Sequence, residues 1–459
     1  MITIAWISNI TPERHRHTKV GTSDQNGHWW CPPLRICMHP SERGSGIIAR
    51  IRRSIGFSRD FAILLSALVV VALGFGFLGP LMPAFRERLG ISDSELGMMF
   101  SLFSFAFVFA LPPAGYLADR LGRKRTIMAG IVLFGCTTLA LVLVTEPIHF
   151  LVLRVLEGVG AALVTPAAFA LTLDLVPEDK RGVAMGAEGT AQLLGAMAGP
   201  TLGGLVAGQL DFTYPFYIAA ALAFACAAII WFIKEPSSRV PSEDSKSILT
   251  MFGAWKRNAM ADRRLPALTM RGFVMGIVQG LWNLGLLMFW ADDIDMTLTQ
   301  TGIAMSIGML TMAIGTVPFG SLSDKYGRKP FIIIGGALMA AGLAMMVLAS
   351  QAWHVYILVV VSDFGAAMSN PSVGAMLGDV MKKEERGRVM GAYQTVMGVG
   401  NIVGFSALGL MYDYVNHQAP ILVCAAALAV ATSIIGLYVK ETHKARDPGK
   451  GTAEAASGA

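Results

Sequence analysis

Apolar stretches of about 20 residues, separated by short polar segments, recur along this chain of 459 residues. The hydrocarbon core of a bilayer is about 30 Å thick, and a helix needs about 20 mostly apolar residues to cross it. A transmembrane β-barrel would instead show strands of about 10 residues with alternating polarity. The pattern therefore predicts an all-α membrane protein with twelve transmembrane helices, at Phe61–Phe85, Leu96–Leu117, Thr126–Val144, Ile148–Leu173, Val183–Gly208, Tyr214–Ile233, Phe273–Ala291, Gly302–Leu322, Phe331–Ser350, Trp353–Leu377, Val389–Met411 and Ala419–Val439.

The basic residues gather on alternate loops between these stretches. Of the 37 Lys and Arg residues, nine precede the first stretch and 25 occupy the even-numbered loops and the C-terminal tail. Basic residues accumulate on the cytoplasmic side of membrane proteins, whereas the opposite loops carry acid, as at Asp292, Asp293 and Asp295. We therefore expect a protein of the cell (inner) membrane with both termini in the cytoplasm. The net charge of +6 then reflects topology, and we expect no nucleic-acid partner.

The polar segments divide the chain into five parts. Residues 1–59 lack the charged start and long apolar stretch of a signal peptide. We expect them to be a cytoplasmic extension that is disordered or follows a misassigned start codon. Their histidines and cysteines match no metal-site spacing, so we expect no metal. The other predicted parts are a six-helix bundle at 60–233, a cytoplasmic linker at 234–271, a second six-helix bundle at 272–440 and a disordered cytoplasmic tail at 441–459.

The two bundles are related by a duplication. At a shift of 205 residues, GYLADRLGRKR (Gly115–Arg125) aligns with GSLSDKYGRKP (Gly320–Pro330). The same shift aligns Pro166 with Pro371 and Arg181 with Arg386. Each half holds six predicted helices, so the two copies keep the same orientation in the membrane. Parallel repeats of this kind place a substrate site at their interface, near the middle of the membrane.

The repeated loop resembles the signature loop of the major facilitator superfamily, and the resemblance covers about residues 60–442. Its glycines allow close backbone approach and a tight turn, while Asp119 and Arg123 place opposite charges at a helix end. In that family the aspartate meets the start of a helix from the other half, and the arginine pairs with an acid at the end of the fourth helix, here Asp174. The resemblance thus implies a cytoplasmic gate made by Gly115, Asp119, Gly122, Arg123, Asp174, Gly320, Asp324, Gly327, Arg328 and Asp379.

The fifth predicted helix carries GAEGTAQLLGAMAGPTLGG, which is similar to the antiporter motif of the 12-helix drug:proton antiporters in this superfamily. The resemblance implies a proton-coupled exporter and multidrug resistance. Any membrane helix could use the same residues for close packing around a kink. The second half has Phe405 in place of the proline, so the motif belongs to the first half. Its matching residues are Gly186, Gly195, Gly199, Pro200, Gly203 and Gly204.

Ionisable side chains are rare inside the predicted spans, and such residues are expensive in a bilayer and usually functional. Arg154 and Glu157 lie one turn apart on the fourth helix, Glu188 on the fifth and Asp363 on the tenth. Arg154 matches an arginine that the superfamily links to proton coupling, and Glu157 stands where the family usually has glutamine. We expect one of the three carboxylates to carry the proton, with Arg154 as counter-charge. A static Arg154–Glu157 pair is the alternative.

Polar and aromatic residues of the second half suggest a binding site for a moderately apolar molecule with a few polar groups. The first helix holds no acidic residue, which argues against cationic drugs. The substrate-binding candidates are Gln279, Trp282, Asn283, Asn370, Gln394 and Asn401.

These observations favour a secondary active transporter that exports small organic molecules, such as drugs or metabolites, by alternating access. No ATP-binding P-loop and no hydrolase motif occurs, so we expect neither an enzyme nor any cofactor beyond the coupling proton. A proton symporter or facilitator that imports a nutrient remains open, because the gate motifs are shared by both. A membrane sensor on the same scaffold would need a soluble output domain, for which no loop is long enough. We expect a monomer that contacts only lipid and its substrate.

Overall fold

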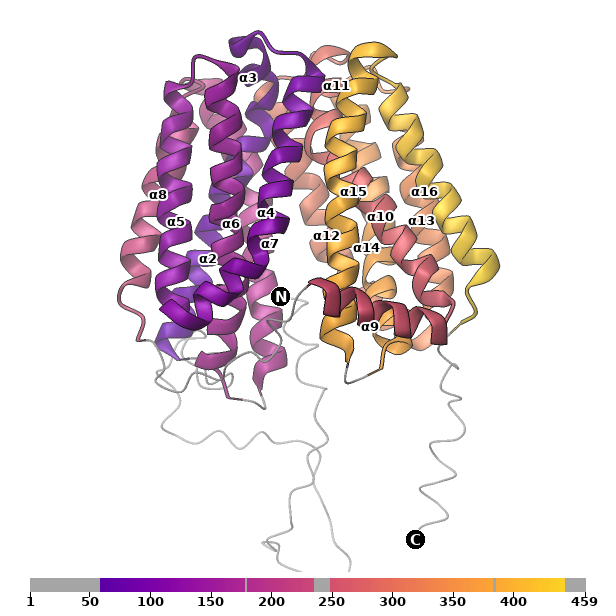
Figure 1. Ribbon diagram of the computed structural model, residues 1–459. Helices are drawn as coiled ribbons and strands as arrows, with labels where there is room; N and C mark the ends of the chain where they lie inside the picture. The colour runs from indigo at the N-terminus through magenta and orange to yellow at the C-terminus, as the bar shows by residue number, and fades with distance from the viewer. Residues whose placement is uncertain (1–57, 178–179, 235–247, 383–384, 442–459) are drawn as a thin grey trace, which may run out of the picture. The chain divides into compact units, whose positions relative to one another are not determined.

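The computed structural model describes residues 58–177, 180–234, 248–382 and 385–441. Most of the predicted N-terminal extension, the middle of the predicted linker and almost all of the predicted C-terminal tail lie outside the described residues. So do the histidines and cysteines of that extension. The described residues are helical and contain no strand, which confirms the all-α class (Figure 1).

In each half, the described residues form six helices at the positions of the predicted spans, and the first of the six is interrupted. The first half consists of α2 (Arg59–Leu78), the 3-10 turn η3 (Gly79–Leu81), α3 (Met82–Leu89), α4 (Asp93–Leu121), α5 (Arg123–Ala140) with the 3-10 turn η4 (Leu141–Leu143), α6 (Pro147–Leu175), α7 (Arg181–Gln209) and α8 (Tyr214–Ile230). The second half consists of α9 (Ile248–Ala261), α10 (Arg264–Gly280), the π-helical turn η6 (Leu281–Gly285), α11 (Leu286–Asp292), α12 (Leu298–Tyr326), α13 (Arg328–Met346), α14 (Ala352–Val380), α15 (Arg386–Tyr414) and α16 (Ala419–Tyr438).

The predicted duplication is visible in the helix boundaries. The starts of α2, α4, α5, α6, α7 and α8 lie 205 residues before the starts of α10, α12, α13, α14, α15 and α16. The packing repeats as well. A Cβ on Gly130 would come within 2.6 Å of the Gly160 carbonyl oxygen, and a Cβ on Gly335 within 2.6 Å of the Gly365 carbonyl oxygen. Glycine at both places therefore lets α5 approach α6, and α13 approach α14, backbone to backbone.

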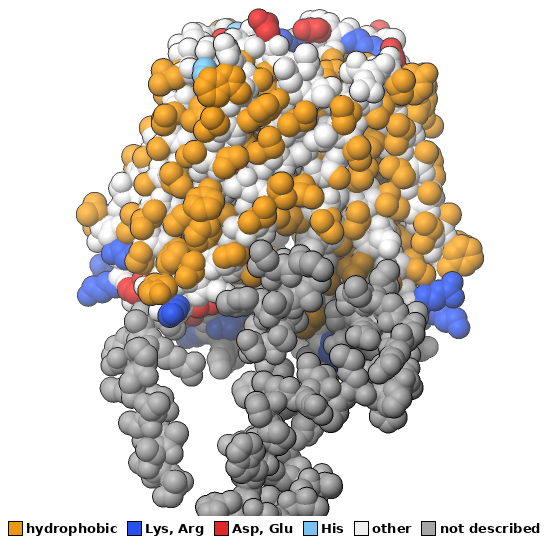
Figure 2. Space-filling model, turned by 180° about the vertical axis from the view of Figure 1, so that it is seen from behind, with side chains coloured by type: hydrophobic (Ala, Val, Ile, Leu, Met, Phe, Trp, Pro, Cys, Tyr) orange, Lys and Arg blue, Asp and Glu red, His pale blue; other side chains and the backbone are white. Residues whose placement is uncertain are grey.

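Ten of the described helical segments are long and apolar enough to cross a membrane. Of the two other predicted spans, α8 is apolar but only 17 residues long, and α7 has the same 29-residue length as α4 and α6. Glycine replaces large apolar side chains on α7 because this helix packs closely on two sides. A broad band of hydrophobic side chains covers the face in Figure 2, with Asp and Glu prominent at its upper rim and Lys and Arg at its lower rim.

Helices occupy part of the segment that was predicted as the linker. The linker was expected to extend to residue 271, but α10 already begins at Arg264, and Leu265, Leu268 and Arg271 are buried. The sequence pattern did not predict these helical turns as part of the membrane span, because basic residues interrupt the apolar stretch there. Within the same linker the helix α9 packs on the second half, where Arg257 pairs with Glu385 at 2.5 Å.

Candidate functional site

The signature loops are tight turns that join consecutive helices. Only Gly122 separates α4 from α5, and only Gly327 separates α12 from α13. Their φ values are +105° and +99°, a region that side chains other than glycine rarely adopt. Both glycines are therefore required by the backbone. We call this end of the helices the basic end, and the opposite end, at Asp93, Asp292 and Asp413, the acidic end.

An arginine follows each turn and ties it to a neighbouring helix of the same half. Arg123 Nη1 donates to the Ala170 carbonyl oxygen at 2.7 Å and forms an ion pair with Asp174 on α6. In the second half Arg328 Nη1 donates to the Ala375 carbonyl oxygen at 2.6 Å and pairs with Asp379 on α14. The two arrangements are copies of each other.

The aspartates of the signature loops lie beside these pairs. Asp324 is 3.3 Å from Arg328, and 62% of its side chain is exposed. Asp119 is half-buried at the corresponding place in the first half. The arginine pairs and the Asp324 contact hold helices within a half. A contact of either aspartate with a helix from the other half remains a prediction.

The halves meet through glycines in the acidic half of four helices. A Cβ on Gly97 of α4 would collide with the Phe405 carbonyl oxygen of α15. One on Gly302 of α12 would collide with the Pro200 carbonyl oxygen of α7, and one on Gly204 of α7 with the Leu298 carbonyl oxygen. The backbones of the two halves are thus in direct contact at this level.

The same helix faces are open toward the basic end. Gly115 lies 18 residues after Gly97, which is about five helical turns and therefore the same face, yet no neighbouring side chain or helix among the described residues comes within 4 Å of its Cβ position. Gly186 lies 18 residues before Gly204 and is equally open. Among the described residues, a Cβ on Gly320, 18 residues after Gly302, would meet only Pro371 of its own half, at 3.8 Å. These pairs of helices touch at the acidic end and diverge toward the basic end.

The predicted antiporter motif forms two interfaces at once. A Cβ on Gly195, Gly199 or Gly203 would strike backbone atoms of α2 in the same half, while Gly204 faces α12 in the other half. Pro200 lies in this segment and packs against Gly76 of α2. The motif is therefore a close-packing element that joins α7 to both partners, and its link to antiport remains a prediction.

The predicted proton-coupling residues occupy three separate environments. Arg154 and Glu157 form an ion pair at 2.5 Å inside the first half, with Glu157 fully buried. The Arg154 guanidinium lies over the rings of Phe100 and Phe150, at 5.4 and 5.1 Å from their centroids. Cation–π contacts of this kind stabilise a desolvated cation.

The other two carboxylates are buried in separate places. Glu188 of α7 has Gln192 Nε2 at 3.5 Å. Asp363 of α14 packs against Gly308 of α12 and is 7% exposed. Within the described part of the chain, no hydrogen bond or ion pair to Asp363 is found. The structure therefore separates Asp363 from the Arg154–Glu157 pair.

The substrate candidates divide between the α10–α11 break and the contact between the halves. Trp282 and Asn283 lie in the π-helical turn, where such turns often mark functional sites, and Gln279 precedes it. Trp282 packs edge to face on Trp290 at 6.3 Å. Gln279 and Asn283 are exposed.

The remaining candidates lie on α14 and α15. Asn401 accepts a hydrogen bond from Ser104 of α4 at 2.8 Å, so it joins the halves. Gln394 is exposed and Asn370 is half-buried. Gln394 precedes Gly398 by one turn on α15, and Gly398 faces Val108 of the other half. Gln394 thus lies on the face that turns toward the first half.

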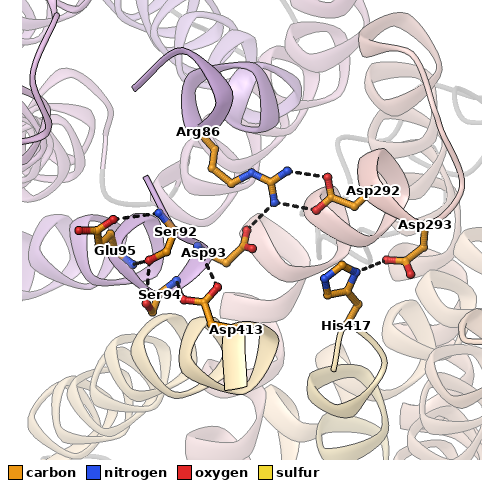
Figure 3. A network of polar contacts seen from close by, with 9 residues as sticks. All are labelled: Arg86, Ser92, Asp93, Ser94, Glu95, Asp292, Asp293, Asp413 and His417. Carbon is orange, nitrogen blue, oxygen red and sulfur yellow. Dashed lines mark hydrogen bonds and ion pairs between the residues drawn. The ribbon is translucent and has the colours of Figure 1, made fainter. Parts of the chain in front are cut away.

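A charged network at the acidic end was not predicted from the sequence (Figure 3). Arg86 at the end of α3 donates two hydrogen bonds of 2.6 Å to Asp292 of α11 and one of 2.8 Å to Asp93. From α15, Asp413 accepts from the backbone N–H groups of Asp93 and Ser94 at 3.2 and 2.9 Å. Both connections cross between the halves, and the second caps the start of α4 with a negative charge.

Only a partial signal for this network is present in the sequence. Asp292 and Asp293 stand out there as acidic loop residues, and Arg86 as a basic residue on the side where few occur. Their pairing joins positions 206 residues apart, which no local pattern reveals.

A model of the family described as the Major Facilitator Superfamily matches residues 64–280 and 268–458. The chain belongs to the Major Facilitator Superfamily. The two matches overlap slightly and account for both halves. This family assignment also explains the repeated signature loop and the parallel arrangement of the two six-helix copies.

Several relatives within the superfamily are drug-resistance proteins. Multidrug resistance protein 2 of Bacillus subtilis (strain 168) is 28% identical over 396 residues, covering 84% of this chain and 96% of the relative. Quinolone resistance protein NorA of Staphylococcus aureus (strain COL) is 25% identical over 399 residues, covering 85% and 98%. The crystal structure of a mutant of the nucleoside transporter NupG matches with a TM-score of 0.68 at 15% identity, covering 82% of this chain and 100% of that one. The chain is thus a multi-pass membrane transporter of this superfamily.

Proposed function

We propose that this transporter exports small organic molecules in exchange for protons. The observation that carries the proposal is the buried carboxylate of Asp363, which has no hydrogen-bonding or ionic partner among the described residues. A lone carboxylate is costly to keep charged in a helix bundle. Binding a proton removes that cost. The proton gradient therefore changes the charge of this side chain, and with it the packing that the surrounding helices favour.

The packing of Asp363 supports a coupling role. Its Oδ2 lies 2.2 Å from the position that a Cβ on Gly308 would take. Gly308 belongs to α12, the helix that meets α7 of the other half through Gly302. A change in the charge of Asp363 therefore acts on one of the helices that form the contact between the halves. The Arg154–Glu157 pair is the second candidate for proton uptake.

The uneven contact between the halves supports a mechanism of alternating access. With the basic end in the cytoplasm, as basic residues favour, the described conformation opens toward the cytoplasm and can receive a molecule from there. The signature-loop ion pairs keep each half rigid while the halves move. Closure of the basic end would bring the face of Gly115 to the second half and that of Gly320 to the first half.

Export is supported by two relatives that are named as resistance proteins, and by the glycine motif on α7. Proteins that carry substrate together with protons share this fold, as the D-xylose-proton symporter does. The direction of flux therefore has to be tested separately. No cofactor beyond the proton is needed, and a monomer suffices.

The test is flux into proteoliposomes driven by an imposed pH gradient, measured with a panel of resistance-type drugs including a quinolone. We expect Asp363→Asn to reduce proton-driven flux by at least about tenfold, as for loss of a group required in the coupled step, while counterflow without a gradient continues. Glu157→Gln and Glu188→Gln are compared in the same assay.

A matched control is Asp295→Asn. Asp295 is exposed and has a φ of +57°, which asparagine tolerates, so this variant should transport normally. Wild-type flux from all three variants of the buried carboxylates would exclude coupling through them. Uptake that runs with the proton gradient would indicate a symporter.

A further inference from the structure

Arg271 is a buried cation in a segment that the sequence pattern assigns to the linker. It lies in the second turn of α10, its side chain is 1% exposed, and it is among the largest fully buried side chains of the described residues. The rest of its helix packs on α15, where Gly272 lies against the Tyr393 ring. A guanidinium in this position has lost nearly all of its hydration.

Little in the structure replaces that hydration. Arg271 Nη2 donates to Ser369 Oγ of α14 at 2.6 Å. Arg271 Nε has no hydrogen-bond partner among the described residues. A neutral hydroxyl is a weak substitute for water, because buried charges normally require an opposite charge as well as hydrogen bonds.

The acidic residue of the same region points elsewhere. Asp363 precedes Ser369 by six residues on α14, which rotates the two side chains by about 240° around the helix. Asp363 accordingly faces Gly308 of α12, whereas Ser369 faces Arg271. Tyr393 of α15 lies beside Arg271 in the same packing, and a tyrosine is neutral at ordinary pH. Among the described residues, Arg271 therefore lacks a carboxylate counter-ion in this conformation.

The surroundings of Arg271 connect it to the space between the halves. Its partner Ser369 precedes Asn370, and its neighbour Tyr393 precedes Gln394, so two of the polar substrate candidates follow these residues directly in the sequence. Gln394 is exposed on the face of α15 that turns toward the first half. In the first half the positions equivalent to Arg271 and Tyr393 are Ser66 and Glu188, so the cation belongs to the second half alone.

We infer that Arg271 is an anion-binding residue and that the transported molecules include organic carboxylates, which its guanidinium binds when the helices rearrange around the substrate. The inference rests on the proposed function because it names a substrate class for that transporter. The planar fork of N–H donors matches a carboxylate with two parallel hydrogen bonds. Ser369 then holds the guanidinium while the site is empty. The absence of acid from the first predicted span agrees with an anionic rather than a cationic substrate.

The experiment compares acids with amides of the same shape. Purified wild-type protein is titrated calorimetrically with three pairs: 1-naphthoate and 1-naphthamide, benzoate and benzamide, and indole-3-acetate and indole-3-acetamide. We expect at least one acid to bind about tenfold or more tightly than its amide, the ratio typical of a charge-assisted hydrogen-bonded pair. Arg271→Gln should abolish this preference, and Arg271→Lys should retain part of it.

The matched control is Arg263→Gln, which removes an exposed arginine eight residues earlier and should leave the preference intact. Equal binding of acid and amide by the wild type in all three pairs would overturn the inference, even if Arg271→Gln failed to fold. So would an acid preference that survives in Arg271→Gln. Because the assay measures binding without a gradient, absence of proton-driven flux would count against the proposed function alone.

Discussion

The acidic and basic ends of the helices hold their charges in different ways. At the acidic end Arg86, Asp292 and Asp413 connect one half of the chain to the other. At the basic end Arg123 and Arg328 form ion pairs inside their own halves. Charges that cross between halves can stabilise one conformation over another, whereas charges within a half keep that half rigid in every conformation. We call the contacts at the acidic end the latch, because they join the two halves in the described conformation.

The glycines follow the same division. Gly97 and Gly302 are pressed against backbone of the opposite half, but Gly115 and Gly320, on the same faces, are not. In the described conformation these two glycines serve no contact between the halves, because no described residue of the opposite half approaches them. We therefore expect a second conformation, in which the basic end closes around these two glycines.

The largest expected effect comes from Gly115→Leu. No neighbouring side chain or helix among the described residues comes within 4 Å of the Cβ position, and leucine favours helix over glycine by about 1 kcal/mol, so thermal stability should not fall. Closure at the basic end should be blocked, and flux should fall by more than about tenfold, corresponding to over about 1.4 kcal/mol. Flux into proteoliposomes and thermal melting are measured on the same preparations.

The companion variant is Gly97→Leu on the same helix. Its side chain would overlap the Phe405 carbonyl oxygen, so this variant should destabilise the described conformation while Gly115→Leu does not. If Gly115→Leu transports at the wild-type rate, the basic end does not need to close around this residue.

A smaller effect is expected from Arg86→Gln. The lost pair is bidentate, and only 16% and 19% of the Arg86 and Asp292 side chains are exposed, so its removal should cost about 1–3 kcal/mol of the latched state. The population with the acidic end apart should rise about fivefold or more. Spin-label distances across the acidic end measure that population.

Arg88→Gln is the control for this change. Arg88 is exposed and donates to the Val142 carbonyl oxygen of its own half, at 3.3 Å. If Arg86→Gln and Arg88→Gln gave the same distance distribution, Arg86 would not be part of a latch.

The smallest effect concerns α9 and pH. The Arg257 guanidinium, by donating to Glu385, holds the pKa of Glu385 below its usual range. A depressed pKa in the folded protein contributes stability that is present above the unfolded-state pKa and is lost as the pH falls through the folded-state pKa. Hydrogen exchange of the α9 amides, corrected for the intrinsic rate, should therefore show weaker protection only in acid below the ordinary glutamate pKa.

Glu385→Gln lacks the titrating group, so its α9 protection should no longer change across that acidic range. Parallel loss of protection in this variant and the wild type would assign the pH effect to another group.

Much of the fold could be predicted because short stretches of sequence determine the helices and the turns between them. Apolar runs located the membrane helices, and the shift of 205 between the signature loops recurs in the starts of six helix pairs. The turns at Gly122 and Gly327 also depend on adjacent residues alone. The helix positions of the second half can therefore be predicted from those of the first.

The contacts that distinguish one conformation were not predictable in this way. The Arg86–Asp292 pair depends on how two halves dock, and single residues carry no record of their distant partners. The burial of Arg271 was not predicted for a different reason. A basic residue beside a polar segment normally marks the end of a transmembrane span, so Arg271 was assigned to the linker. Its burial emerges only when α10, α14 and α15 are packed together.

Contact between the halves should alternate between the two ends as the protein works. The most direct test measures two spin-label distances in reconstituted protein whose native cysteines have been replaced. One pair, at Tyr116 and Tyr326, spans the basic end, and the other, at Leu210 and Val415, spans the acidic end; all four residues are exposed. We predict two populations. In one the basic-end distance is long and the acidic-end distance short, in the other the reverse holds, and their proportions change with pH. A single distance at each end under all conditions, in protein that still transports, would contradict alternating contact.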